Sequence, residues 1–323
     1  MASSKLFTYG PDYVDSLLTT TKSVMLQMGE YLNDAVFSKI PILRYLEDKA
    51  RVTKQGGASI LVAHLTGAND TFAAYSKDDT FNTMGQEGMT LSQATWRNYG
   101  GTIRLLGDET RQNAGSGKLH DLMKAKVQQA MLSARDRLAI DLHASTQAAK
   151  AIQTLVTLID ATSTIQEINS TSNSYWQAQV TASGVFAAQG IANMRTLRDN
   201  IAKQGQGGAP LPDMILTTQT VAELYEASQL SALRYRPADS RDASQERMVW
   251  GGAPVVFDPN CASGVLYMLS SDALQFVVHS DANWKIGDFI EPSSQDAKIA
   301  KVIWMGNLVT NNRRRLGKLT GIS

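Results

Sequence analysis

Residues Lys118–Thr146, KLHDLMKAKVQQAMLSARDRLAIDLHAST, form the stretch that decides the fold of this chain. Apolar side chains recur in it at spacings of three and four, which is the period of one face of a helix. The spacing predicts a helix of roughly 28 residues, or about 42 Å. The main apolar stripe consists of Leu119, Met123, Val127, Ala130, Ala134 and Leu138.

The predicted helix also has a second apolar face, which Leu122 and Ile140 open. Ser116 is a suitable N-cap and no proline interrupts the run, so the whole stretch is expected to stay helical. Arg137 and Asp141 are four residues apart and are expected to pair on the helix surface. A helix of this length with two apolar faces needs partners on two sides, which predicts a core helix of a large domain.

The composition describes an ordinary folded protein. The chain has 323 residues, of which 43% are hydrophobic and 19% charged, so it can bury a sizeable core in one or two domains. A net charge of +1 gives no support to a polyanion-binding class. The single cysteine, Cys261, excludes an intrachain disulfide framework and is typical of a reducing compartment. The sequence shows neither a signal peptide nor a transmembrane run, so a soluble intracellular product is expected.

Residues 51–106 are predicted to form a long two-stranded hairpin. Ser59–Leu65 is an apolar run bounded by glycines, and Met89–Leu106 alternates loosely, so each is expected to be a strand. The loop of roughly twenty residues between them is long enough to suggest a function of its own. This loop contains the aromatic residues Phe72, Tyr75 and Phe81. They either contact a neighbouring molecule or pack back on their own domain, and the sequence leaves both interpretations open.

The rest of the chain mixes helices and strands without regular alternation, which is typical of an α+β fold. Phe186–Lys203 has helical spacing, and Thr218 is expected to cap another helix. The polar segment 232–245, which carries Arg234 and Arg236, is expected to be an exposed loop. Strands are predicted at Met214–Leu216, Pro254–Phe257, Val265–Leu269, Leu274–Val278, Lys298–Met305 and Leu308–Leu319.

No group of side chains in the sequence predicts a catalytic, cofactor or metal site. None of the four histidines stands at ligand spacing from another or from Cys261: His64, His120, His143 and His279. Neither a nucleophile elbow nor a phosphate-binding glycine loop occurs. Cys261 is expected to be a buried or loop thiol and not a nucleophile. The cluster Arg313–Arg315 is expected either to touch phosphates or to form a solvated or inter-subunit face.

The order of these parts resembles the major capsid proteins of tailed bacteriophages, which share the Hong Kong 97-like fold. In that family an N-terminal arm precedes a two-stranded E-loop, and a spine helix then crosses a peripheral (P) domain. An axial (A) domain follows before the chain returns to the P-domain. The resemblance is one of layout, and no short motif carries it. It implies an arm at 1–50, an E-loop at 51–94, a P-domain strand and spine helix at 95–150, an A-domain at 151–288 and final P-domain strands at 289–323.

The resemblance implies a structural protein and not an enzyme. Copies of the chain would form hexamers and pentamers that close into an icosahedral head around double-stranded DNA. The implied partners are a separate scaffolding protein, a portal and decoration proteins, with no membrane and no cofactor. The implied location is the virion, and the host cytoplasm during assembly. The residues expected at subunit contacts are Phe72, Tyr75, Lys77, Phe81, Arg234, Arg236, Arg313, Arg314 and Arg315.

The sequence departs from some members of the family. Many members begin with a scaffolding segment that is cleaved after assembly, whereas this sequence starts almost at the arm, which favours a separate scaffolding protein. Some members cross-link an E-loop lysine to an asparagine of a neighbour. The matching residue types here are Lys54, Lys77, Asn307, Asn311 and Asn312. An encapsulin shell, an enzyme of unrecognised type and another virion component such as a tail protein are the alternatives that the sequence leaves open.

Overall fold

The computed structural model describes residues 40–67, 69, 71–85, 88–112, 116–203, 211–233 and 248–323. The helices and 3-10 turns are α2 (Pro41–Asp48), α3 (Gly107–Gln112), α4 (Ser116–His143), α5 (Leu155–Leu158), η1 (Ser174–Trp176), α6 (Phe186–Lys203), α7 (Gln219–Leu233), η3 (Ser271–Ala273) and η4 (Arg313–Arg315). The early strands are β1 (Val52–Gln55), β2 (Ile60–Leu65), β3 (Met89–Ala94), β4 (Arg97–Leu106), β5 (Thr164–Ile165), β6 (Ile168–Asn169) and β7 (Gln179–Gly184). The later strands are β8 (Met214–Thr217), β9 (Val249–Trp250), β10 (Ala253–Phe257), β11 (Leu266–Leu269), β12 (Leu274–His279), β13 (Lys285–Ile286), β14 (Ala297–Thr310) and β15 (Gly317–Ile322).

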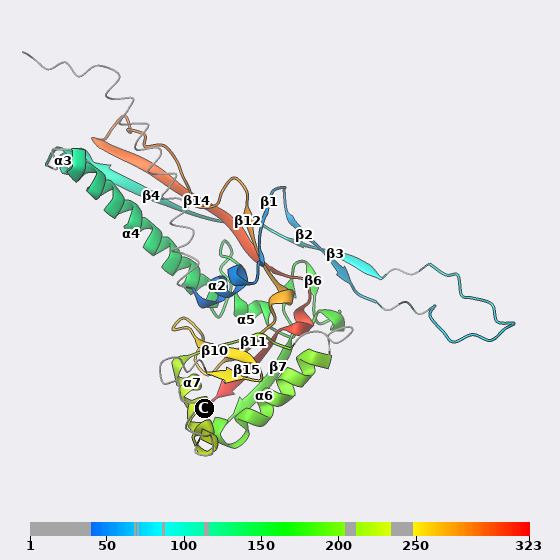
Figure 1. Ribbon diagram of the computed structural model, residues 1–323. Coiled ribbons are helices and arrows are strands. Elements are labelled where there is room, and N and C mark those ends of the chain that lie inside the picture. Colours follow the sequence, from blue (N-terminus) through cyan, green and yellow to red (C-terminus); the bar gives the residue numbers. More distant parts are fainter. Residues whose placement is uncertain are drawn as a thin grey trace, which may run out of the picture.

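The long central helix predicted from the sequence is confirmed as α4, which has 28 residues. It lies along the ribbon formed by β4 and β14 (Figure 1). Its buried face holds Val127, Met131, Leu138 and Leu142. The other apolar face stays open, because Leu132 is 48% exposed and Ile140 is 53% exposed. The described residues therefore cover only one of the two faces along the described part of this helix.

The sheet beside α4 contains β1, β12, β14 and β13, with β4 paired to β14, and is called the first sheet. β4 and β14 are antiparallel and pair from Leu106 with Ala297 to Arg97 with Gly306. Side chains alternate across a strand, so one face of this ladder is buried under α4. Trp304 is fully buried there and stacks on two further rings, those of Phe276 and Trp284. This aromatic cluster belongs to the same buried core as the apolar face of α4.

The second sheet has the strand order β7-β15-β11-β8-β10-β9. All four residues of β8 and all four of β11 are buried, as expected for strands covered on both faces. The helix predicted at Phe186–Lys203 is confirmed as α6, and it buries Phe186, Met194, Leu197 and Ile201. α7 covers the sheet with Val221 and Tyr225. The helical spacing of these residues is what places one apolar stripe on the sheet.

Two regions differ from the sequence prediction. Met89–Leu106 was expected to be one strand, but it is interrupted at Thr95 and Trp96, because β3 pairs with β2 whereas β4 pairs with β14. At this point, where the chain leaves the pairing with β2 and begins the pairing with β14, the indole of Trp96 donates a hydrogen bond of 2.9 Å to the carbonyl of Gly57. Near the C-terminus, β14 is a single strand of 14 residues that runs through the predicted break between Met305 and Leu308. The strand predicted at Leu308–Leu319 is instead interrupted by η4.

The chain passes between the two sheets more often than the sequence suggests. β12 lies in the segment 151–288 expected for an A-domain, yet it pairs with β14 in the first sheet. β15 lies in the segment 289–323 expected for a P-domain, yet it pairs with β7 and β11 in the second sheet. In the described residues, none of the helices is long and apolar enough to cross a membrane.

Candidate subunit interface

The predicted hairpin is confirmed at its base, where β2 and β3 pair from Ile60 with Ala94 to Leu65 with Met89. One face of this ladder rests on the body, since Ile60 and Ala94 are buried against Val277 and Val309. The loop beyond the ladder projects away from both sheets (Figure 1). The opposite face of the ladder carries exposed apolar side chains, Leu61, Met89 and Leu91. The hairpin therefore has one docked face and one free apolar face.

The loop of the hairpin holds the most exposed aromatic side chains of the described residues. Phe72 is 94% exposed, and Tyr75 and Phe81 are each 68% exposed. The rings of Tyr75 and Phe81 lie 4.8 Å apart and shield one another only in part. The sequence left open whether these rings contact a neighbouring molecule or pack on their own domain. In the described residues they do not pack on their own domain. Exposed apolar groups in such density mark interaction surfaces.

Local hydrogen bonds give the loop its shape. The backbone amide of Ser76 donates to the carboxylate of Asp79 at 2.6 Å, and the amide of Asp79 donates back to the carbonyl of Ser76 at 3.1 Å. The side chain of Asn69 accepts from the amide of Thr71 at 2.9 Å. Lys77 lies in the turn closed by Ser76 and Asp79 and is exposed. These bonds preorganise the turn and so reduce the entropy that binding would cost.

A groove of about 500 Å³ lies between α4 and β4. Small residues leave it open on both sides: Gly100, Gly101, Ala130 and Ala134. Its basic residues are Arg104, Lys126 and Arg137. Lys126 pairs with Glu109 at 2.8 Å, and Arg137 pairs with Asp141 at 3.0 Å, as the spacing of the latter two predicted. This groove and the hairpin are two surfaces of the described chain that offer space or apolar area to another molecule.

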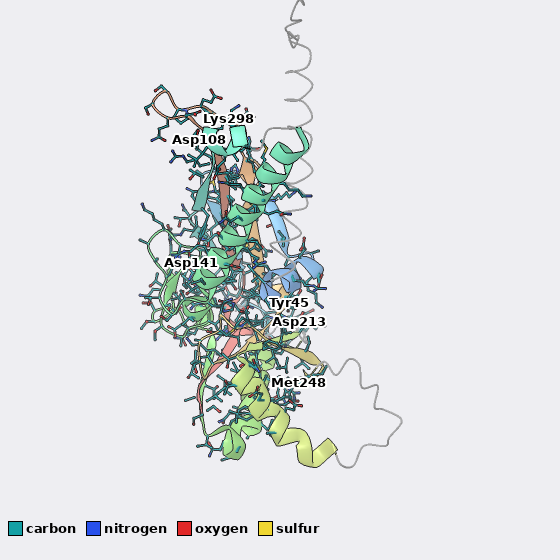
Figure 2. All side chains as sticks on the ribbon, turned by 90° about the vertical axis from the view of Figure 1, so that its left-hand side faces the viewer. Tyr45, Asp108, Asp141, Asp213, Met248 and Lys298 are labelled. Carbon is teal, nitrogen blue, oxygen red and sulfur yellow. The ribbon has the colours of Figure 1, made fainter. Side chains whose placement is uncertain are left out.

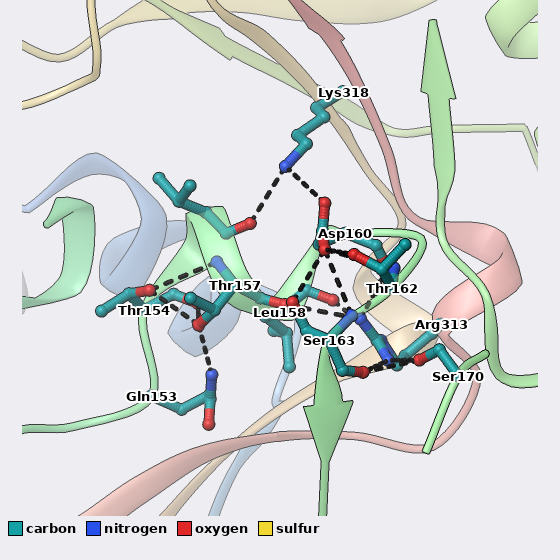
Figure 3. A network of polar contacts seen from close by, with 11 residues as sticks. Gln153, Thr154, Thr157, Leu158, Asp160, Thr162, Ser163, Ser170, Arg313 and Lys318 are labelled. Carbon is teal, nitrogen blue, oxygen red and sulfur yellow. Dashed lines mark hydrogen bonds and ion pairs between the residues drawn. The ribbon is translucent and has the colours of Figure 1, made fainter. Parts of the chain in front are cut away.

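The prediction that Arg313 belongs to a subunit contact is wrong. Its side chain is fully buried in its own subunit, beside Asp160 and Ser170 (Figure 3). The guanidinium donates to the carbonyls of Leu158 at 2.9 Å, Ser163 at 3.0 Å and Asp160 at 2.6 Å, and to the hydroxyl of Ser170. Burial lowers the pKa of Arg313 to about 10, with Asp160 acting in the opposite direction. Through these hydrogen bonds, Arg313 holds the C-terminal end of α5 and the loop that follows it in place.

The other arginines predicted at subunit contacts lie in different environments. The guanidinium of Arg315 is close to its own subunit's Asp272, at 3.6 Å, and donates to the hydroxyl of Ser270 at 3.0 Å. Arg314 is half-buried, and its contact role stays a prediction. Arg234 and Arg236 lie outside the described residues.

Asn307 is not available for the cross-link considered in the sequence analysis. It is buried and donates to the carbonyl of Thr95 at 2.9 Å, while its side-chain oxygen accepts from the amide of Gln153 at 3.0 Å. An asparagine with both ends engaged in its own subunit has no free amide for a neighbour's lysine.

A second polar cluster ties the start of the described chain to the second sheet. The hydroxyl of Tyr45 donates to Asp213, and Figure 2 shows the two side chains meeting between the sheets. Asp213 also accepts from the backbone amide of Ser271 at 2.9 Å and from the hydroxyl of Ser271 at 2.6 Å. Burial, and then the neighbouring carboxylate of Asp213, raise the pKa of Tyr45. The hydroxyl therefore stays a proton donor, and the cluster is structural.

The structure brings together three reactive residue types that the sequence analysis treated as separate. The imidazole of His143 lies between Cys261, at 3.6 Å from Nδ1, and Asp258, at 3.3 Å from Nε2. All three side chains are buried. Burial, and then the charge of Asp258, raise the pKa of the Cys261 thiol, which disfavours the nucleophilic thiolate.

This cluster also lacks the geometry of a metal site. The thiol and the carboxylate lie at opposite nitrogens of the imidazole ring, so they do not converge on one point. Within the described part of the chain, no group of three or more His, Cys, Asp or Glu side chains could hold a metal ion. His143 therefore joins the end of α4 to the turn after β10.

Comparison with known proteins identifies the fold. No protein-family model and no curated protein sequence matches the chain. Its structure is similar to the capsid asymmetric unit of cyanophage A-1(L), with a TM-score of 0.63 and 14% identity over 84% of this chain and 90% of that one. The procapsid of satellite phage P4, which includes the size determination protein, has a TM-score of 0.53 and 12% identity over 99% and 94%.

A cellular shell protein has a similar structure. The holo-SrpI encapsulin complex of Synechococcus elongatus has a TM-score of 0.55 and 11% identity, covering 87% of this chain and 88% of that one. The chain therefore has the α+β Hong Kong 97-like fold of the major capsid proteins of tailed bacteriophages.

Proposed function

We propose that this chain is the structural major capsid protein of a tailed bacteriophage. Its copies form hexamers and pentamers that close into an icosahedral head around double-stranded DNA. The fold supports this assignment, and the exposed aromatic hairpin is the observation that carries it, because Phe72, Tyr75 and Phe81 are left largely exposed by the described residues of their own subunit. A neighbouring copy would bury these rings.

The positions of the two candidate surfaces favour ring formation. The hairpin projects from one side of the subunit, whereas α4 and β4, which line the groove, lie towards the other (Figure 1). A contact between two different patches of identical subunits is heterologous, and it closes into rings when the rotation permits. Each contact can be weak, because a subunit in a shell makes several at once and their effects accumulate. We propose Phe72, Tyr75, Lys77, Phe81 and Arg314 as contact residues in such rings.

The proposed partners follow from this role. A separate scaffolding protein, a portal and decoration proteins would act with the capsid protein, which would occupy the host cytoplasm during assembly and then the virion. The solved P4 procapsid includes a size determination protein, which is a precedent for such an accessory factor in that phage. An enzymatic role has less support, because the Cys261, His143 and Asp258 cluster is buried.

A cellular encapsulin shell is the second candidate function. The similarity to the SrpI encapsulin, with a TM-score of 0.55, is the observation that favours it. Both candidates predict closed shells, and the contents separate them. Nucleic acid inside purified shells would support the phage head, and a protein cargo would support the encapsulin.

Negative-stain microscopy of the purified protein, alone and with its neighbouring gene products, tests both candidates together. We expect closed shells with diameters on the order of tens of nanometres in size. Small discrete particles under every condition would overturn the proposal. A variant that lacks Gly67–Gly85, with a short turn in their place, is expected to remain folded and soluble but to build no stable shells.

A further inference from the structure

A buried histidine adds polar contacts to the apolar docking of the hairpin on the body. His64, on β2, is only 4% exposed. Its Nδ1 lies 2.7 Å from the carbonyl of Asn311, just beyond the end of β14, and its Nε2 lies 2.5 Å from the hydroxyl of Ser92 on β3. The ring meets Trp176 edge-on, with 4.5 Å between the centroids. This one side chain thus joins both hairpin strands to η1 and to the end of the first sheet.

The hydrogen-bond partners define the protonation state of the docked ring. A carbonyl oxygen can only accept, so Nδ1 of His64 must donate to Asn311. In the neutral ring Nε2 then has no proton and accepts from the hydroxyl of Ser92. The carbonyl of Val62 lies 3.3 Å from the same hydroxyl and is its alternative acceptor. If Nε2 gained a proton, the oxygen of Ser92 would have to accept from the ring and its hydroxyl hydrogen would have to turn to the more distant carbonyl of Val62.

The surroundings of the ring disfavour a positive charge. Among the described residues, the groups against the imidazole are the hydroxyl of Ser92, the carbonyl of Asn311 and the indole of Trp176, and none is a carboxylate. The guanidinium of Arg313 lies over the same indole, 6.0 Å from its centroid, and adds a positive charge nearby. Burial lowers the pKa of His64, although the hydrogen bond to Asn311 acts in the opposite direction.

We propose that His64 is the positioning residue that fixes the direction of the hairpin, and that its protonation releases the hairpin base from the body. This inference rests on the proposed function, because the hairpin is the surface that would contact the neighbouring copy. In the undocked hairpin the ring is in water and binds a proton readily. The docked state binds fewer protons, so lowering the pH through the ordinary histidine range favours undocking.

Hydrogen exchange on the unassembled subunit tests the inference directly. We expect the protection factors of the β2 and β3 amides, corrected for intrinsic rates, to fall several-fold between about pH 7.5 and about pH 5. In His64→Asn, the side-chain amide can still donate to the carbonyl of Asn311 but cannot gain a proton. This variant is expected to keep its protection at both pH values and to assemble at both.

His279 provides the matched control. Its ring also contacts the base of the hairpin, 5.3 Å from Trp96, but it is only half-buried. His279→Asn is expected to keep the acid response of the wild type. Equal protection of the wild type at both pH values, or an unchanged acid response in His64→Asn, would overturn the inference even if shells form normally. Failure of the wild type to form shells would count against the proposed function alone, because the exchange measurement needs only the subunit.

Discussion

The hydroxyl of Tyr99 on β4 donates a hydrogen bond of 2.9 Å to Asp141 on α4 and accepts one of 3.0 Å from the backbone amide of Ile152. Asp141 also binds Arg137, so the bond joins the long helix, the first sheet and the segment that leads to the second sheet. Burial raises the pKa of Tyr99. The hydroxyl therefore keeps its proton and remains a donor to Asp141.

Removing this hydroxyl should destabilise the subunit without changing its packing. Tyr99→Phe leaves the amide of Ile152 without its acceptor and Asp141 with one donor fewer. We expect a loss of about 2 kcal/mol in the free energy of unfolding, measured by urea denaturation of the unassembled subunit. Tyr75→Phe removes a hydroxyl from an exposed ring and serves as the control. Equal stability of Tyr99→Phe and the wild type would show that water replaces the lost bonds.

Replacing Arg313 should be far more costly than replacing Arg314. Lysine keeps the charge but cannot span the carbonyls of Leu158, Ser163 and Asp160 with one ammonium group. We expect Arg313→Lys to lose about 3 kcal/mol of unfolding free energy. Arg314→Ala, at the half-buried neighbour, should stay within about 0.5 kcal/mol of the wild type. Similar values for the two variants would contradict the structural role assigned to Arg313.

Polar substitution of the loop aromatics should separate folding from assembly. Phe72, Tyr75 and Phe81 contribute little to their own subunit because they are exposed, so the triple serine variant should unfold within about 0.5 kcal/mol of the wild type. It should form far fewer shells by sedimentation and microscopy. Val180→Ser, Val249→Ser and Phe257→Ser together remove exposed apolar groups from the second sheet and provide a comparison. Normal assembly of the loop variant would contradict the contact role of these rings.

Acid should weaken the network around Asp160. Partial burial opposes the ionised carboxylate, but hydrogen bonds from Ser163 and Thr162 outweigh it, and with Lys318 nearby they hold the pKa of Asp160 well below its ordinary value of 3.8. The unfolded chain has the ordinary pKa, so the stabilisation is complete above that pH and is lost as the pH falls below it. Unfolding free energies measured between about pH 7 and about pH 3 should fall less steeply in Asp160→Asn. Asp136→Asn, an exposed carboxylate on α4, should leave the slope unchanged.

Local sequence patterns were sufficient to predict a helix or strand where that element buries a single stripe of apolar side chains. The prediction of a helix at Lys118–Thr146 agrees with α4 to within a few residues, and the prediction at Phe186–Lys203 agrees with α6 at both ends. The hairpin base followed from glycines around Ser59–Leu65 and from alternation in Met89–Leu106. In each case the decisive contacts are periodic along the chain, and periodicity is visible in a sequence.

Contacts between distant segments could not be predicted in the same way. Three arginines in a row suggest a solvated cluster, but Arg313 is buried because carbonyls up to 156 residues earlier in the chain surround it. His143 and Cys261 meet although 118 residues separate them. The sequence of β15 likewise contains no sign that it joins the second sheet. Burial of such groups depends on topology, and no local spacing encodes it.

The pairing of β14 with β4 and of β15 with β7 and β11 has a consequence for synthesis in the cell. Both sheets receive a strand from β14 or β15, so neither is complete until residues 297–322 have left the ribosome. Non-local strand pairing of this kind forms late in folding. A nascent copy therefore cannot present the finished subunit surface to a neighbour before β14 and β15 have paired.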